Sequence, residues 1–221
     1  MDHGQHFDRE MRETNWHRFW QRQLERREQI VAWLDTLGVG PGDRFLDVGS
    51  GPGLASLLAA ERVGRRGRVV ALDRNPEALE LLRHQARRRK LDWIETITAD
   101  AAAMPFLSGA FTHAMLTLVL HHLVDPMPVM KEIRRVLAAG GRLLAADYRP
   151  DGDLSVGPPA EARVSARQAA GWMRAAGFSV LEQGLTPPHW FYVLGAAGEG
   201  LGTAGERAAE GAGYGAGAGA G

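Results

Sequence analysis

A glycine-rich loop follows an apolar run early in the chain: "FLDVGSGPG" spans residues 45–53. Glycines at the end of a buried strand let the backbone approach a bound molecule closely, because they carry no Cβ. The acidic residue Asp73 follows about 20 residues later, at the end of "RVVALD", where a carboxylate can accept hydrogen bonds from both hydroxyls of an adenosine ribose. Together the two features predict a ligand that contains adenosine.

The spacing of the loop glycines argues against a phosphate ligand. From Gly49 to Gly53 the chain reads Gly-Ser-Gly-Pro-Gly, without the third glycine of the dinucleotide-binding G-x-G-x-x-G pattern. Pro52 also lacks the backbone N–H that a pyrophosphate could use. We therefore expect an adenosine ligand without phosphates, and a nicotinamide dinucleotide is the alternative.

Two adjacent histidines, His121 and His122, follow the fourth predicted strand. A neutral imidazole beside a reacting group could take a proton from it, so both are candidate catalytic residues. The other interpretation, which we favour, is a hydrogen-bonded pair that only holds the loop together.

A metal centre is not expected. The chain has no cysteine, which excludes disulfides, thiolate zinc sites and a cysteine nucleophile. His3, His6 and His17 could suggest a metal, but no carboxylate cluster accompanies them.

The elements that must position these residues alternate between strands and helices. Asn75 before Pro76 and Asp125 before Pro126 are typical of helix starts, and the spacing of Ser165 and Gln168 predicts a capping box. This alternation predicts an α/β fold with a Rossmann-like, mostly parallel seven-stranded sheet and helices on both faces. The expected strands are 44–48, 68–73, 94–99, 111–118, 142–148, 178–183 and 190–194.

The connection between the last two strands is short. "GLTPPH" leaves no room for a parallel crossover, so the sheet should end in an antiparallel hairpin at one edge. A plain dinucleotide-binding domain would not end in this way.

At this point the sequence resembles the class I S-adenosylmethionine-dependent methyltransferases, and among them the ubiquinone and menaquinone C-methyltransferase branch. "FLDVGSGPG" and "VVALDRNPEAL" are similar to the first two motifs of that family, and the likeness continues through "ITADAAAMPF", "HHLVDPMPVMKEIRRVL" and "GGRLLAADY". The resemblance covers roughly residues 40–194 and implies S-adenosylmethionine as the cofactor. The cofactor contacts that it implies are Asp47, Gly49, Ser50, Gly51, Gly53, Asp73, Arg74, Asp100, Ala101 and Thr117.

Several of these residues also have a structural interpretation. Asp47 could only organise the loop, and Asp100 could only form a turn at a strand end. Ser50 and Thr117 could contact the ligand through the backbone alone, because short hydroxyl residues are common in turns.

Three zones divide the chain. We expect an N-terminal helical cap over residues 1–39, the cofactor-binding domain over 40–194, and a disordered Gly- and Ala-rich tail over 195–221. Trp16, Phe19 and Trp20 in the cap follow helical spacing, either as core packing, which we favour, or as the lid of a substrate pocket. The basic run "RHQARRRK" over residues 83–90 could bind phosphate, but a solvated helix end is the favoured interpretation.

The charge balance favours a small-molecule acceptor. The 26 Lys and Arg residues equal the 26 Asp and Glu residues, which gives no reason to expect nucleic acid as a partner. No export signal or apolar run long enough for a membrane span is seen, so we expect a cytoplasmic protein. The hypotheses are a methyltransferase for a small molecule (at O, C or N), one for RNA or protein, and a non-catalytic or NAD-binding domain.

Overall fold

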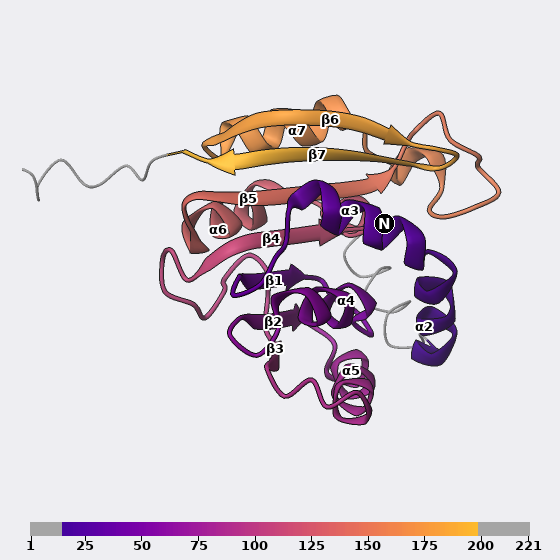
Figure 1. Cartoon of the computed structure of the whole chain (residues 1–221). Coiled ribbons are helices and arrows are strands. Elements are labelled where there is room, and N and C mark those ends of the chain that lie inside the picture. Colours follow the sequence, from indigo (N-terminus) through magenta and orange to yellow (C-terminus); the bar gives the residue numbers. More distant parts are fainter. Residues whose placement is uncertain (1–14, 199–221) are drawn as a thin grey trace, which may run out of the picture.

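The computed structural model describes residues 15–198, which form one sheet with helices on both sides (Figure 1). The strands are β1 (Arg44–Val48), β2 (Arg68–Asp73), β3 (Ile94–Thr98), β4 (Phe111–Thr117), β5 (Leu137–Tyr148), β6 (Phe178–Thr186) and β7 (Trp190–Ala197). The helices are α2 (Trp16–Glu25), α3 (Arg27–Leu37), α4 (Leu54–Val63), α5 (Pro76–Arg88), α6 (Met127–Val136) and α7 (Ala166–Ala175), with short 3₁₀ turns η1 (Leu120–His122) and η2 (Ala160–Ala162).

The strand order is β3-β2-β1-β4-β5-β7-β6. The first five strands in that order are parallel, and β7 runs antiparallel to both of its neighbours, β5 and β6. The predicted seven-stranded sheet and its antiparallel hairpin are therefore confirmed. The order reverses direction between β1 and β4, which is the point where open α/β sheets bind ligands.

The inner strands β1, β2, β4 and β5 bury side chains on both faces, as parallel sheets covered by helices do. Helices α3, α4 and α5 pack on one face, against Phe45, Val69 and Leu144 among others. Helices α6 and α7 pack on the other face, against Leu46, Leu116 and neighbours. Figure 1 shows α3 and α4 in front of the sheet and α6 and α7 behind it.

Two of the predicted helix starts have the expected caps. The Asn75 side chain accepts hydrogen bonds from the backbone N–H groups of Glu77 and Ala78, with Pro76 in the first turn. Ser165 and Gln168 form the predicted capping box of α7. The Asp125 side chain accepts from the Met127 N–H at 3.0 Å, although α6 itself begins at Met127, one residue later than the proline pattern suggests.

Five strand boundaries differ from the expected ones. β3, β4 and β6 end at Thr98, Thr117 and Thr186 rather than at residues 99, 118 and 183. β5 begins at Leu137 rather than residue 142, directly after α6, so Gly140 lies within β5. β7 continues to Ala197 rather than ending at residue 194, because Gly195 and Ala196 pair with Leu143 and Arg142 of β5. The first residues assigned to a tail are therefore part of the sheet.

The remaining terminal predictions lie outside the described residues. They concern residues 1–14 of the expected cap, with His3 and His6, and residues 199–221 of the expected tail. Over residues 15–198, none of the helices has the length and apolar character that a membrane crossing requires.

Candidate active site

The glycine loop lies between β1 and α4, at the reversal point of the sheet. The backbone N–H groups of Gly49 and Ser50 donate to the Leu72 carbonyl at 2.8 and 3.1 Å, which fixes the loop to the end of β2. Asp47 at the end of β1 and Asp73 at the end of β2 both lie beside it. The structure therefore brings together the first motif residues and the acid that the sequence placed about 20 positions later.

Two of the loop glycines are required by close packing against protein atoms. A Cβ on Gly49 would lie 2.5 Å from a methyl group of Val119, and one on Gly53 would lie 2.5 Å from Leu82. Both residues also have a positive φ, which non-glycine residues rarely adopt. These glycines therefore hold the loop tightly against Val119, which precedes η1, and against α5, a role that the sequence pattern alone does not reveal.

Asp47 and Asp73 are two buried carboxylates with raised pKa values. Burial raises the pKa of Asp47 to about 6, although Ser56 donates its hydroxyl to the carboxylate at 2.6 Å, and the nearby Asp73 adds to the shift. Burial also raises the pKa of Asp73, while hydrogen bonds from Asn75 and Gly51 oppose the shift. Negative charge gathered in this way favours a ligand with positive charge.

Helix α2 covers the glycine loop through Gln23. The Gln23 amide nitrogen donates to the Ser50 carbonyl at 3.3 Å, and its oxygen accepts from the Leu54 N–H at 3.0 Å. This contact caps the first turn of α4, whose N-cap residue Gly53 has no side chain to do so. Sequence reasoning missed Gln23, because the contact depends on how two separate elements pack.

The aromatic residues of the cap have two kinds of contact: some pack in the core, and others lie beside the glycine loop. Trp20 packs at the margin of the core under α3 and α4. Trp16 is buried against Phe19, with ring centroids 5.6 Å apart, and reaches within van der Waals distance of a Cβ built on Gly51. Phe19 also lines a cavity beside the loop. Part of this aromatic group therefore packs and part covers the site.

That cavity has a volume of about 50 Å³. Ligand pockets usually measure about 300–1,000 Å³, so we expect α2 to move outward when a nucleoside binds. The cavity is lined from the cap by Phe19, Gln23, Arg26, Ile30 and Trp33, and from the sheet and α4 by Asp47, Gly49, Ser50, Gly51, Ala55, Thr117 and Leu118.

The other predicted cofactor contacts occupy the rim of the site. Thr117 ends β4 and is followed by Leu118, which has a positive φ of 57° that places backbone strain at the cavity. The Asp100 side chain accepts from the Ala102 N–H at 2.9 Å, so it forms the turn after β3, with Ala101 within that turn. Arg74 is exposed at the end of β2, and its charge contributes to lowering the pKa of His122.

The two histidines lie in η1, directly after β4, and they differ in their surroundings. His121 is held by Asp147 of β5, whose Oδ1 lies 2.7 Å from its Nδ1. The His122 ring is 3.9 Å from the His121 ring between centroids. Burial, with contributions from His121 and Arg74, lowers the pKa of His122 to about 3. His122 is therefore neutral at physiological pH.

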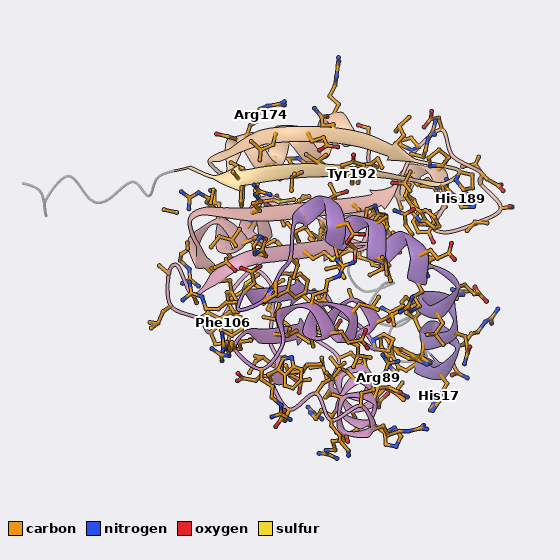
Figure 2. The ribbon with its side chains drawn as sticks, in the orientation of Figure 1. His17, Arg89, Phe106, Arg174, His189 and Tyr192 are labelled. Carbon is orange, nitrogen blue, oxygen red and sulfur yellow. The ribbon has the colours of Figure 1, made fainter. Side chains whose placement is uncertain are left out.

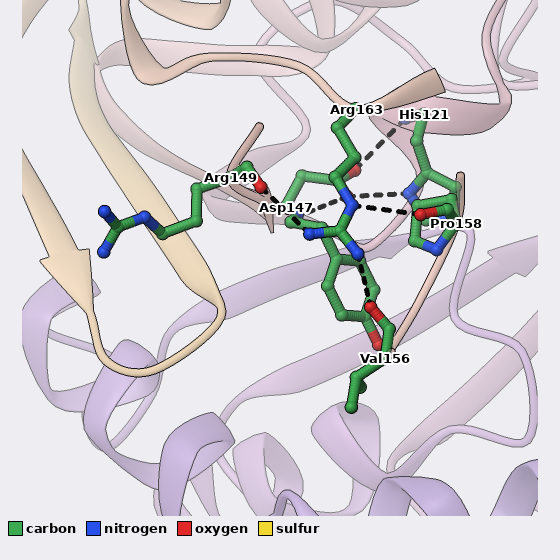
Figure 3. A network of polar contacts seen from close by, with 7 residues as sticks. His121, Asp147, Arg149, Val156, Pro158 and Arg163 are labelled. Carbon is green, nitrogen blue, oxygen red and sulfur yellow. Dashed lines mark hydrogen bonds and ion pairs between the residues drawn. The ribbon is translucent and has the colours of Figure 1, made fainter. Parts of the chain in front are cut away.

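A buried arginine holds the segment that follows β5 (Figure 3). The Arg163 guanidinium donates to the carbonyls of Arg149, Asp153, Val156 and Pro158 at 2.5–3.2 Å and lies 5.6 Å from the Tyr148 ring centroid. Four carbonyl acceptors satisfy this cation. The segment over residues 149–163 is thereby fixed beside the His121–Asp147 pair.

No metal site is found in the part of the chain that the structure describes. Residues 15–198 contain no group of three or more potential metal-binding side chains close together. His17, whose side chain is drawn on α2 in Figure 2, is exposed. In the basic run, Arg83 pairs with Glu80, and Arg89 lies 3.2 Å from Glu61, which agrees with a solvated, ion-paired helix end.

The strand order with an antiparallel β7 defines a Rossmann-like methyltransferase fold. A solved S-adenosylmethionine-dependent methyltransferase of Aquifex aeolicus superposes with a TM-score of 0.71 at 22% identity, over 76% of this chain and 89% of that one. Residues 46–145 match the family model described as a methyltransferase domain. This region of the chain is therefore a methyltransferase domain, similar to those of the S-adenosylmethionine-dependent enzymes.

Two relatives show how far the sequence similarity extends. The ubiquinone/menaquinone biosynthesis C-methyltransferase UbiE of Hahella chejuensis is 32% identical over 133 residues, which cover 60% of this chain and 50% of that protein. An uncharacterized 37.1 kDa protein in transposon TN4556 of Streptomyces fradiae is 38% identical over 122 residues, which cover 54% of this chain and 34% of that protein. The chain thus spans half or less of the length of these relatives.

The site suits the cofactor of this family. S-Adenosylmethionine is a nucleoside without phosphates that carries a positive sulfonium and an ammonium group. Asp47 and Asp73 are buried acids whose pKa values are raised, and a cation beside them would favour their ionised forms. The phosphate-free ligand that the sequence predicted is therefore consistent with the charges around the loop.

The contact of Gln23 with the glycine loop leads to a prediction about cofactor entry. Gln23→Ala leaves the Leu54 N–H without its partner, so the free energy of unfolding should fall by about 1 kcal/mol. The same loss weakens the closed position of α2, and association of S-adenosylhomocysteine should become about 5-fold faster. Stopped-flow fluorescence of Trp16 and the other tryptophans would measure this rate.

Gln21→Ala is the matched control, because Gln21 is exposed on the same helix. It should change neither stability nor the association rate. An association rate for Gln23→Ala equal to or below that of the wild type would contradict the expected movement of α2.

Proposed function

We propose that this protein transfers a methyl group from S-adenosylmethionine to a small-molecule acceptor. The observation that carries this proposal is the pair of buried acids, Asp47 and Asp73, at the two strand ends that flank the glycine loop. The cofactor supplies a methyl group already activated on a positive sulfur. The protein's main contribution is then to align it with the acceptor, which can lower a barrier by roughly 7–11 kcal/mol.

Different residues would contact different parts of the cofactor. Asp73 would hold the ribose, because its two oxygens keep lone pairs beyond the bonds they accept from Gly51 and Asn75. Asp47, Ser50 and the glycines at 49, 51 and 53 would face the methionine part. Asp100 with Ala101 and Arg74 would lie toward the adenine, and Thr117 would approach from β4. His121 and His122 would stand on the acceptor side, after β4.

A small acceptor is supported by the closed arrangement of the site. Helix α2 contacts the loop through Gln23, and the segment over residues 149–163 is held by Arg163, so a polymer would have to displace both. The balanced charge of 26 basic and 26 acidic residues offers no polyanion-binding field. The named activity of the Hahella chejuensis relative, biosynthesis of ubiquinone and menaquinone, is also small-molecule methylation.

Titration calorimetry with three ligands tests the cofactor assignment. We expect S-adenosylmethionine and S-adenosylhomocysteine to bind with micromolar or tighter affinity and NAD not to bind. The mass of any nucleoside that copurifies with the protein gives an independent reading. Binding of NAD in preference to both adenosyl ligands would reject the proposal.

A further inference from the structure

Arg26 lies at the junction of the two cap helices and is held there by its backbone. It follows α2 and precedes α3, its N–H donates to the Gln23 carbonyl at 3.1 Å, and its carbonyl accepts from the Ile30 N–H at 3.0 Å. Residues three positions apart on a helix lie on the same face. Arg26 therefore lies about one turn beyond Gln23, on the side of α2 that contacts the glycine loop.

The Arg26 guanidinium has no ion-pair partner within residues 15–198. Its Nε donates to the Arg22 carbonyl at 2.9 Å, whereas its two terminal nitrogens form no hydrogen bond to any part of the chain that the structure describes. Neither terminal nitrogen is among the fully buried nitrogens that lack a partner in that range. Both are therefore accessible to a bound molecule.

The position of Arg26 makes an unpaired charge unfavourable. The residue is half-buried, and burial lowers its pKa, while the nearby Tyr148 opposes that shift. A cation that is partly removed from water is stabilised when an anion supplies charge-assisted hydrogen bonds. Arg26 is therefore suited to hold a negatively charged group of a ligand.

The cavity beside the glycine loop indicates which group this is. Among the described residues that line it, two are charged, and their charges are opposite in sign. Arg26 lines the cavity from the cap, and Asp47 lines it from β1. A group that complements both charges carries an ammonium for Asp47 and a carboxylate for Arg26. An α-amino-acid group has this chemistry.

We infer that Arg26 is a specificity-determining residue that binds the carboxylate of an α-amino-acid group, an inference that rests on the proposed function. With Nε bound to the Arg22 carbonyl, the two terminal nitrogens remain for the two carboxylate oxygens. S-Adenosylmethionine has such a group in its methionine part, and an amino-acid acceptor would have another. The site would then discriminate against ligands that lack the carboxylate.

Titration calorimetry with two ligands isolates the carboxylate. S-Adenosyl-3-thiopropylamine differs from S-adenosylhomocysteine only in lacking this group. We expect the full wild-type chain to prefer S-adenosylhomocysteine by roughly 10- to 100-fold, the range for hydrogen bonds to charged groups. In Arg26→Gln the preference should fall to within about 3-fold, because only S-adenosylhomocysteine loses a charged partner. Arg26→Lys keeps the charge without the planar guanidinium and should be intermediate.

Arg18→Gln is the matched control, because Arg18 is an exposed arginine of α2 outside the cavity lining. It should keep the wild-type preference. Melting curves establish that the variants are folded, and Arg26→Lys serves as the test if the glutamine variant is not.

The same variants identify the source of the carboxylate. If Arg26→Gln keeps the ligand preference but loses about 10-fold or more of the methyl transfer into amino acids of a bacterial extract, the carboxylate belongs to the acceptor. Equal weakening of both ligands, or no change in either preference or transfer, would overturn the assignment. Failure of the wild type to bind either adenosyl ligand would instead reject the proposed function.

Discussion

Asp73→Ala is expected to weaken the binding of S-adenosylmethionine by about 10- to 100-fold. The ribose would lose hydrogen bonds to a charged carboxylate, which are worth about 1.5–3 kcal/mol. The substitution would also remove two hydrogen bonds within the protein, because the same carboxylate accepts from the Gly51 N–H at 2.7 Å and from the Asn75 N–H at 2.9 Å. The substitution therefore loosens the glycine loop as well, and the loss should lie toward the upper end of that range. Titration calorimetry measures it.

Asp92→Asn is the control for Asp73, because Asp92 is an exposed acid that pairs with Arg65 at the surface. Its affinity for the cofactor should equal that of the wild type. Asp73→Asn keeps one acceptor oxygen and should fall between the control and the alanine variant. Unchanged affinity in Asp73→Ala would remove this residue from the site.

Asp47→Asn should change stability and binding in opposite directions. At pH 8 the folded protein holds an ionised carboxylate whose pKa is raised to about 6 by burial, and removing that charge should stabilise the cofactor-free protein by about 1–3 kcal/mol. Ser56 can still donate to the amide oxygen. Affinity for the positively charged cofactor should fall by about 10- to 100-fold, since the attracting charge is lost.

The stabilisation in Asp47→Asn should depend on pH. The folded-state pKa of about 6 exceeds the ordinary value of 3.8, so the folded protein binds more protons than the unfolded chain between those values. Stability of the wild type therefore falls as the pH rises from about 4 to 6, and the penalty is complete above that range. The melting temperature of the variant should exceed the wild-type value by several degrees at pH 8 and match it near pH 4. Asp35→Asn, at an exposed acid that pairs with Arg62, should show neither effect. A variant less stable than the wild type at pH 8 would contradict this account.

Local sequence signals were sufficient for the elements closest to the cofactor. β1 and β2 have the expected bounds, because each is an apolar run that ends at an acid or a glycine loop. The extension of β7 to Ala197 could not be predicted, since Gly195 and Ala196 have little intrinsic strand preference and are held there by pairing with β5 and β6. Long-range pairing outweighed local composition.

Within the candidate site, too, local sequence indicates some residues, while others are placed only by long-range contacts. Asp73 could be proposed as a site residue from its position at the end of a strand, and the histidine pair from its position after β4; both roles remain predictions. The contacts of Asp147 and Gln23 could not be predicted, because each joins residues 26 or more positions apart: Asp147 contacts His121, and Gln23 contacts Ser50 and Leu54. Arg26 gave no signal among many surface arginines, and only the packing of α2 and α3 places it at the cavity.

Transfer of a labelled methyl group tests the central claim most directly. The full chain is incubated with S-adenosylmethionine that carries a radioactive methyl group and with a bacterial cell extract, which is then separated into small molecules, RNA and protein. We predict label in the small-molecule fraction, lost in Asp73→Ala at limiting cofactor and kept in Asp92→Asn. Label in RNA or protein instead would contradict the assigned acceptor class, and no enzyme-dependent label in any fraction would contradict methyl transfer itself.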